Sequence, residues 1–71
     1  MPYIEIKLAK NEAAPITREM KQELISGITS VVAQVLGRNS NNVMIHIDED
    51  SPDNWGLGGM SISQRRGPSG G

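Results

Sequence analysis

The chain has 71 residues, with seven basic and eight acidic side chains and a formal net charge of −1. Phosphate binding needs a concentrated positive field, and base stacking needs several aromatic side chains. Because the charges nearly balance and the only aromatic residues are Tyr3 and Trp55, the composition argues against a nucleic-acid partner. Small molecules or other protein chains are the expected ligands.

A chain of this length buries only about 60% of the surface that its unfolded form exposes, so its core is marginal. Small folds are usually reinforced by disulfides, a structural metal or self-association. The sequence has no cysteine, and its single histidine, His46, has no spaced partner to complete a metal site. Self-association is therefore the leading expectation, and no metal is expected.

The sequence contains no targeting or membrane-spanning signal. No basic segment followed by an apolar run opens the chain, and no stretch approaches 18 apolar residues, so a cytoplasmic location without membrane contact is expected. The last segment, Arg65–Gly71, is basic and then glycine-rich, which is typical of a tail. We therefore expect one domain over residues 1–66 and a flexible tail over 67–71.

The segment from Tyr3 to Leu8 alternates between apolar and polar residues, which predicts a half-buried strand. A loop is expected from Ala9 to Ile16. The next segment predicts a helix with Thr17 as its N-cap and Gly37 as its C-terminal stop. Its apolar residues recur at three- and four-residue spacing: Met20, Leu24, Ile25, Ile28, Val31, Val32, Val35 and Leu36.

Alternation returns in Val43–Ile47, which predicts a second strand. The order strand, helix, strand favours parallel pairing, with the helix on one face of a small α/β sheet. The other sheet face is expected to meet another subunit, and it includes Glu5, Lys7, Met44 and His46. An acidic loop is expected over Asp48–Asn54, followed by a tight turn or hairpin over Trp55–Met60.

The chain opens with Met1 and Pro2. Removal of the initiator methionine would leave a free proline amine at the head of the first strand. Burial or a neighbouring cation lowers the pKa of such an amine toward neutrality, where it serves as a base. Proline is also tolerated at the first position of a strand for structural reasons alone, so the motif by itself is weak.

Together these features resemble the 4-oxalocrotonate tautomerase family over residues 2–66. The similarity lies in the order and spacing of four segments: Pro2–Lys7, Thr17–Lys21, Val43–Glu49 and Asn54–Gly59. The resemblance implies a β-α-β fold with a C-terminal hairpin that assembles into dimers and commonly hexamers. It also implies that Pro2 is the catalytic base, in a pocket shared between chains, and that Trp55 occupies the position of the family's aromatic pocket residue.

Two expected arginines are missing from this pattern. Better-characterised members hold substrate carboxylates with one arginine after the first strand and one on the second strand, whereas this chain has Lys10 and Met44 in those regions. Methionine cannot form the paired hydrogen bonds that a guanidinium gives a carboxylate. Possible substitute cations are Lys10, Arg18 and Arg38, although a solvated surface charge is the favoured interpretation of each because lysine and arginine are mostly exposed.

Several roles remain open at this level. Trp55 fits either a pocket wall or an anchor for the hairpin, and His46 fits an interface histidine or a proton shuttle. Arg65 and Arg66 rank lower as ligands because they fall in the expected tail.

The leading hypothesis is a small oligomeric isomerase: a cofactor-independent tautomerase of a 2-oxo or 2-hydroxydienoic acid that uses Pro2. Related decarboxylase, hydratase or dehalogenase chemistry would use the same amine. The alternative from another class is a non-catalytic oligomeric binding module that retains the fold, because fold alone does not establish function.

Overall fold

The computed structural model describes residues 1–66. The chain divides into two compact units: Met1–Ile6 with Thr17–Asp48, and Lys7–Ile16 with the chain from Glu49 onward. The elements in order are β1 (Tyr3–Ala9), α1 (Arg18–Leu36), η1 (Ser40–Asn42), β2 (Met44–Asp50), η2 (Pro52–Asn54), β3 (Gly56–Leu57), β4 (Met60–Ser61) and α2 (Ile62–Arg66). The predicted small α/β fold, β-α-β with a C-terminal hairpin, is confirmed; the tail expected over 67–71 lies outside the described residues.

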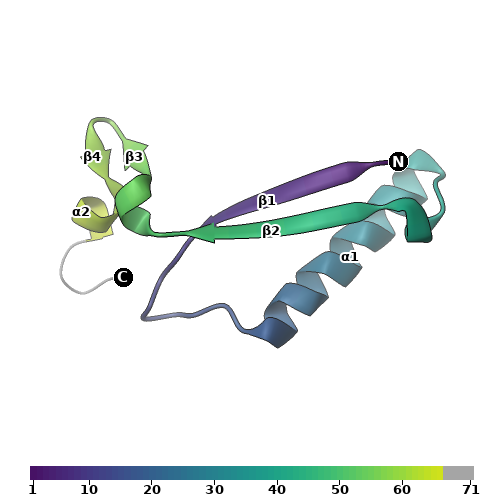
Figure 1. The fold of residues 1–71 in the computed structure, drawn as a ribbon, viewed down its shortest axis with the longest axis horizontal. Helices are drawn as coiled ribbons and strands as arrows, with labels where there is room; N and C mark the ends of the chain where they lie inside the picture. The colour runs from purple at the N-terminus through teal and green to yellow at the C-terminus, as the bar shows by residue number, and fades with distance from the viewer. Residues whose placement is uncertain (67–71) are drawn as a thin grey trace. The chain divides into compact units, whose positions relative to one another are not determined.

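Strands β1 and β2 are neighbours in a two-stranded sheet. The amide of Met44 donates to the carbonyl of Pro2 at 2.9 Å, and the amide of Lys10 donates to the carbonyl of Asp50 at 2.7 Å. Both strands advance in the same direction between these two bonds, so the pairing is parallel (Figure 1). Exposure alternates along β1, with Ile4 and Ile6 half-buried between exposed neighbours.

The second strand is longer than the sequence pattern indicated. The expected loop began at Asp48, but β2 continues through Glu49 to Asp50. Acidic residues have low strand propensity, and main-chain pairing, such as the bond from the amide of Lys10 to Asp50, overrides it here. The strand ends where the Asp50 carboxylate accepts hydrogen bonds from the amide of Ser51 at 3.0 Å and from the Asn54 side chain at 2.8 Å.

Helix α1 has the ends that the sequence predicted. The hydroxyl of Thr17 accepts the amide of Met20 at 3.1 Å, and the Met20 sulfur accepts the amide of Thr17 at 3.4 Å. These reciprocal bonds satisfy amides that would otherwise lack a partner in the first turn. At the other end, Gly37 adopts a left-handed conformation with φ of 64°, which costs glycine little because it has no Cβ.

Replacement of Thr17 by alanine removes the cap oxygen and is expected to lower the free energy of unfolding by about 1 kcal/mol. The Thr17→Ser variant keeps the oxygen and serves as the matched control. Chemical denaturation followed by circular dichroism measures both. Equal stability of the alanine and serine variants would show that this hydrogen bond contributes nothing.

The apolar surface of α1 is wider than the face that packs within the chain. Half-buried Ile25, Ile28 and Val32 lie along one side. Beside this row lies a stripe of exposed apolar side chains, all within about a quarter of the helix circumference: Met20 (51% exposed), Leu24 (37%), Val31 (59%) and Val35 (75%). None of residues 1–66 is fully buried, and none of their helices is long and apolar enough to cross a membrane. The single chain therefore leaves much apolar surface in water.

The predicted hairpin is present in the second unit. Leu57 pairs with Met60 across an antiparallel turn, where Gly58 and Gly59 have φ of 63° and 85°. Positive φ at both central positions is typical of the tightest hairpin turns and favours glycine. Arg65 and Arg66 were expected in a tail, and this prediction was wrong because both belong to α2.

Candidate functional site

Pro2 lies half-buried in the first unit, immediately before β1. Its carbonyl accepts the amide of Met44 at 2.9 Å, which fixes the start of the strand against β2. Met1 is 85% exposed, so its removal would take away little packed surface. Such processing would leave the Pro2 nitrogen as a chain-terminal amine on an anchored strand.

The other candidates of the first unit lie on different elements. Arg18 is the first residue of α1, Arg38 follows its C-cap, and both are exposed. Met44 and His46 have exposed side chains on β2, two positions apart on the same strand face. Of these candidates, Met44 has a hydrogen bond to Pro2, and that bond joins main-chain atoms.

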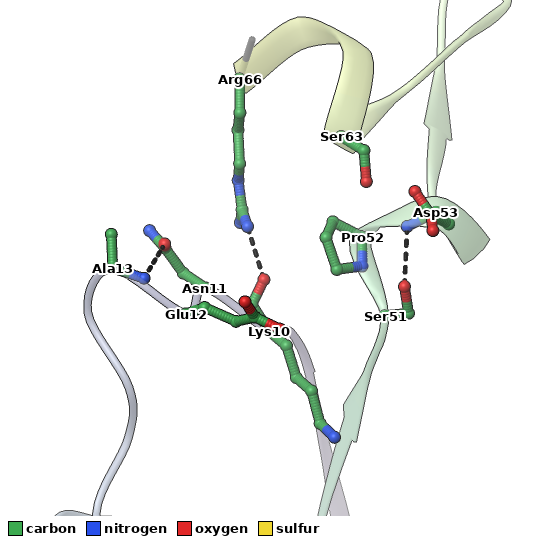
Figure 2. Close-up of a pocket in the computed structure, with 9 residues that line it drawn as sticks. All are labelled: Lys10, Asn11, Glu12, Ala13, Ser51, Pro52, Asp53, Ser63 and Arg66. Carbon is green, nitrogen blue, oxygen red and sulfur yellow. Dashed lines mark hydrogen bonds between the residues drawn. The ribbon is translucent and has the colours of Figure 1, made fainter. Parts of the chain in front are cut away.

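The second unit contains an open cavity of about 460 Å³ (Figure 2), within the size range of small-molecule sites. Its lining comes from three segments: 10–13 after β1, 51–53 around the start of η2, and Ser63 with Arg66 on α2. Of the ligand candidates named from the sequence, Lys10 lines it, as does the lower-ranked Arg66. Six of its nine lining residues have charged or hydroxyl side chains, so the cavity can hold a polar or ionic group beside apolar surface.

Main-chain hydrogen bonds hold Lys10 on both sides. Its amide donates to Asp50 at the end of β2, and its carbonyl accepts Nη1 of Arg66 from α2. The side chain of Lys10 is exposed, whereas Arg66 is half-buried. Figure 2 shows the guanidinium of Arg66 pointing toward the loop of Lys10 and Asn11, while the Lys10 side chain runs away from Arg66.

Local hydrogen bonds shape the two loops that border the cavity. The Asn11 side chain accepts the amide of Ala13 at 3.0 Å, which forms an Asx turn after β1. The hydroxyl of Ser51 accepts the amide of Asp53 at 3.1 Å and starts η2. Both loops are therefore held by their own side chains.

Trp55 is half-buried between η2 and β3, and it is not among the residues that line this cavity. Its amide donates to Pro52 at 3.4 Å, and its carbonyl accepts the amide of Ile62 at 2.8 Å. Within the second unit these two main-chain bonds link η2 to the start of α2, and neither involves the indole ring, so the hairpin-anchoring role stays a prediction. A role as pocket wall remains a prediction.

Arg66 lines this cavity, although the sequence pattern placed it in a tail and ranked it low as a ligand. The missed signal is a capping box: the Ser61 hydroxyl accepts the amide of Gln64 at 3.1 Å, and the Gln64 side chain accepts the amide of Ser61 at 3.0 Å. A serine followed three residues later by glutamine is a sequence signature of a helix start. This motif predicts α2, and hence an ordered Arg66, from residues alone.

Comparisons with known proteins identify the family. The family model described as tautomerase enzyme matches residues 2–65. A probable tautomerase, K2, from Dickeya dadantii is 39% identical over 66 residues, covering 93% of this chain and 94% of that protein. A probable tautomerase from Helicobacter pylori is 42% identical over 66 residues, covering 93% and 96%. The crystal structure of DmpI from Helicobacter pylori has a TM-score of 0.82 at 40% identity, covering 92% and 96%.

The chain belongs to the tautomerase family, because the family model spans nearly all of it. Its fold matches the solved DmpI structure over 92% of this chain. Family membership and the relatives' names indicate an enzyme of the isomerase type with tautomerase activity. The resemblance inferred from the four sequence segments is therefore confirmed.

Proposed function

We propose that this protein is a cofactor-independent tautomerase that interconverts the enol and keto forms of a 2-oxo or 2-hydroxydienoic acid, with Pro2 as the general base and acid. The main support is the position of Pro2, half-buried at the head of an anchored strand in a chain of the tautomerase family. Met1, which precedes Pro2, is 85% exposed. The expected single domain over 1–66 is part of the same proposal.

The reaction needs one proton carrier. The lone pair of the Pro2 nitrogen takes the proton of the enol hydroxyl, and the electrons of that O–H bond form the ketone C=O. The electrons of the carbon–carbon double bond then take a proton from the resulting ammonium, which regenerates the free amine. Such general acid and base catalysis is most effective when the pKa of the group lies near the working pH.

Self-association completes the proposed enzyme. The exposed stripe of α1 consists of Met20, Leu24, Val31 and Val35, which are from 37% to 75% exposed. Burying the exposed part of each such side chain contributes about 1–2 kcal/mol, so association of several chains, up to a hexamer, would stabilise a fold with a marginal core. Pro2 of one chain would then serve a pocket completed by a neighbouring chain.

The substrate carboxylate needs a cation in that pocket. Lys10 is the preferred ligand among the candidates named from the sequence, because it lines a cavity. Arg18 and Arg38 are exposed at the ends of α1 and remain possible contacts across an assembly. Trp55 would provide the apolar wall, and Met44 with His46 would border the site from the exposed face of β2.

The state of the N-terminus provides the direct test. Intact-mass measurement establishes whether Met1 is removed, since its retention converts the Pro2 nitrogen into an amide that cannot accept a proton. The processed protein is expected to turn over phenylenolpyruvate or 2-hydroxymuconate, and a preparation that retains Met1 is expected to be inactive. Equal rates for the two preparations would refute the proposed role of Pro2.

The non-catalytic binding module remains a second candidate because Met44 is apolar and 51% exposed on β2, where other members place an arginine. A processed protein that oligomerises but converts neither substrate would favour this candidate. Decarboxylation, hydration or dehalogenation by the same amine would instead appear as turnover of the corresponding substrates and would be lost with the same Pro2 variants.

A further inference from the structure

We infer that the cavity of the second unit binds a substrate that has a single carboxylate, and that Arg66 is the residue that holds this carboxylate. The inference rests on the proposed function and specifies its substrate class. Arg66 fills the role that would otherwise belong to the absent family arginines, although it lies on a different element, the short helix α2.

A hydrogen bond already orients the guanidinium of Arg66 for carboxylate binding. One of its five N–H groups donates to the carbonyl of Lys10, and the other four make no hydrogen bond within residues 1–66. The side chain is half-buried, so less rotamer freedom remains to be lost on binding than for an exposed arginine. A guanidinium held in this way can form two parallel hydrogen bonds to one carboxylate.

The charges that line the cavity set the number of carboxylates that it accepts. Two positive residues, Lys10 and Arg66, are balanced by two negative residues, Glu12 and Asp53. No ion pair joins these four side chains within the described part of the chain. Once one carboxylate pairs with Arg66, the cavity holds three negative and two positive charges, so a second carboxylate meets a net negative charge. The cavity therefore disfavours dicarboxylates by repulsion, which is a common route to specificity.

Steady-state kinetics with phenylenolpyruvate, which has one carboxylate, and 2-hydroxymuconate, which has two, test this specificity. We expect the wild-type kcat/KM to be about tenfold higher for phenylenolpyruvate. The Arg66→Ala variant is expected to raise KM for phenylenolpyruvate about 10- to 100-fold with little change in kcat, and Arg66→Lys to recover part of the loss. Arg65→Ala, on the same helix but outside the cavity lining, is the matched control with wild-type KM.

A second pair of substitutions leaves the hydrogen bond between Arg66 and Lys10 in place. Glu12→Gln combined with Asp53→Asn removes the negative charges, and it is expected to raise kcat/KM for 2-hydroxymuconate relative to phenylenolpyruvate by about tenfold. An unchanged ratio, or a wild-type preference for 2-hydroxymuconate, would overturn the inference. A change in the expected direction supports it, because loss of loop structure would not favour the dianion.

Binding measured without turnover separates this inference from the proposed function. Benzoate is titrated into the full-length protein and followed by backbone amide chemical shifts at Lys10 and Ser63. We expect at least about tenfold weaker binding in Arg66→Ala than in wild type. Equal binding, or no wild-type binding, would refute the role of Arg66 even if Pro2 variants lose activity. Benzoate binding that depends on Arg66, in a protein whose activity does not depend on Pro2, would instead refute only the proposed mechanism.

Discussion

Replacement of Pro2 by alanine is expected to lower kcat/KM for phenylenolpyruvate by about 10²–10⁴, the usual contribution of a positioned general base. Alanine removes the ring that fixes the terminal nitrogen and leaves a freely rotating primary amine. The main-chain carbonyl of residue 2, which accepts the amide of Met44 at 2.9 Å, is retained. The substitution therefore changes the base while keeping the hydrogen bond that anchors β1 to β2.

The matched control for this experiment is Pro15→Ala. Pro15 is exposed and precedes α1, so its replacement changes a proline without touching the N-terminal amine. Steady-state kinetics on both variants, each checked by intact mass for loss of Met1, measure the difference. If Pro2→Ala and Pro15→Ala both turn over substrate at the wild-type rate, the secondary amine of the proline ring is not required and the proposed role of Pro2 is refuted.

The double substitution Val31→Lys and Val35→Lys is expected to disrupt self-association. These valines are 59% and 75% exposed in the isolated chain, and burial of the exposed part of each in an interface would contribute about 1–2 kcal/mol. Loss of both contributions corresponds to about 30- to 10³-fold weaker association, before the cost of desolvating two lysines is added. Light scattering coupled to size-exclusion chromatography measures the mass of the assembly in solution.

Ser30→Lys is the control for this change, because Ser30 lies on the polar side of the same helix and is exposed. It is expected to leave the assembly intact. A double valine variant that keeps the wild-type mass would show that the exposed stripe of α1 is not an interface. A dissociated variant with full activity would contradict the proposal that the reaction pocket is shared between chains.

Local patterns in the sequence were sufficient for the main elements. The three- and four-residue spacing of apolar residues, with Thr17 and Gly37 at its ends, predicted α1 because caps and amphipathic faces depend on nearby residues. Alternation predicted both strands, and two adjacent glycines predicted the turn at Gly58 and Gly59. The family resemblance depended on the same local segments and their order.

The ends of elements were less predictable. Asp48–Asp50 have the composition of a loop, yet pairing with β1 extends β2 through them. The partner of this pairing is about 40 residues away along the chain, so no local pattern could indicate it. Arg66 was assigned to a tail because glycine-rich sequence follows it, whereas the capping box of Ser61 and Gln64 places it on α2.

The sequence by itself determined the strand, helix and hairpin segments and the family. Only the tertiary structure brought Arg66 into the same cavity as Lys10, since that arrangement depends on a hydrogen bond between residues 56 positions apart. Only the structure also separated the packed face of α1 from its exposed stripe, because both faces have the same apolar composition. Propensity and periodicity act over a few neighbouring residues, whereas cavities and exposure depend on which distant segments meet.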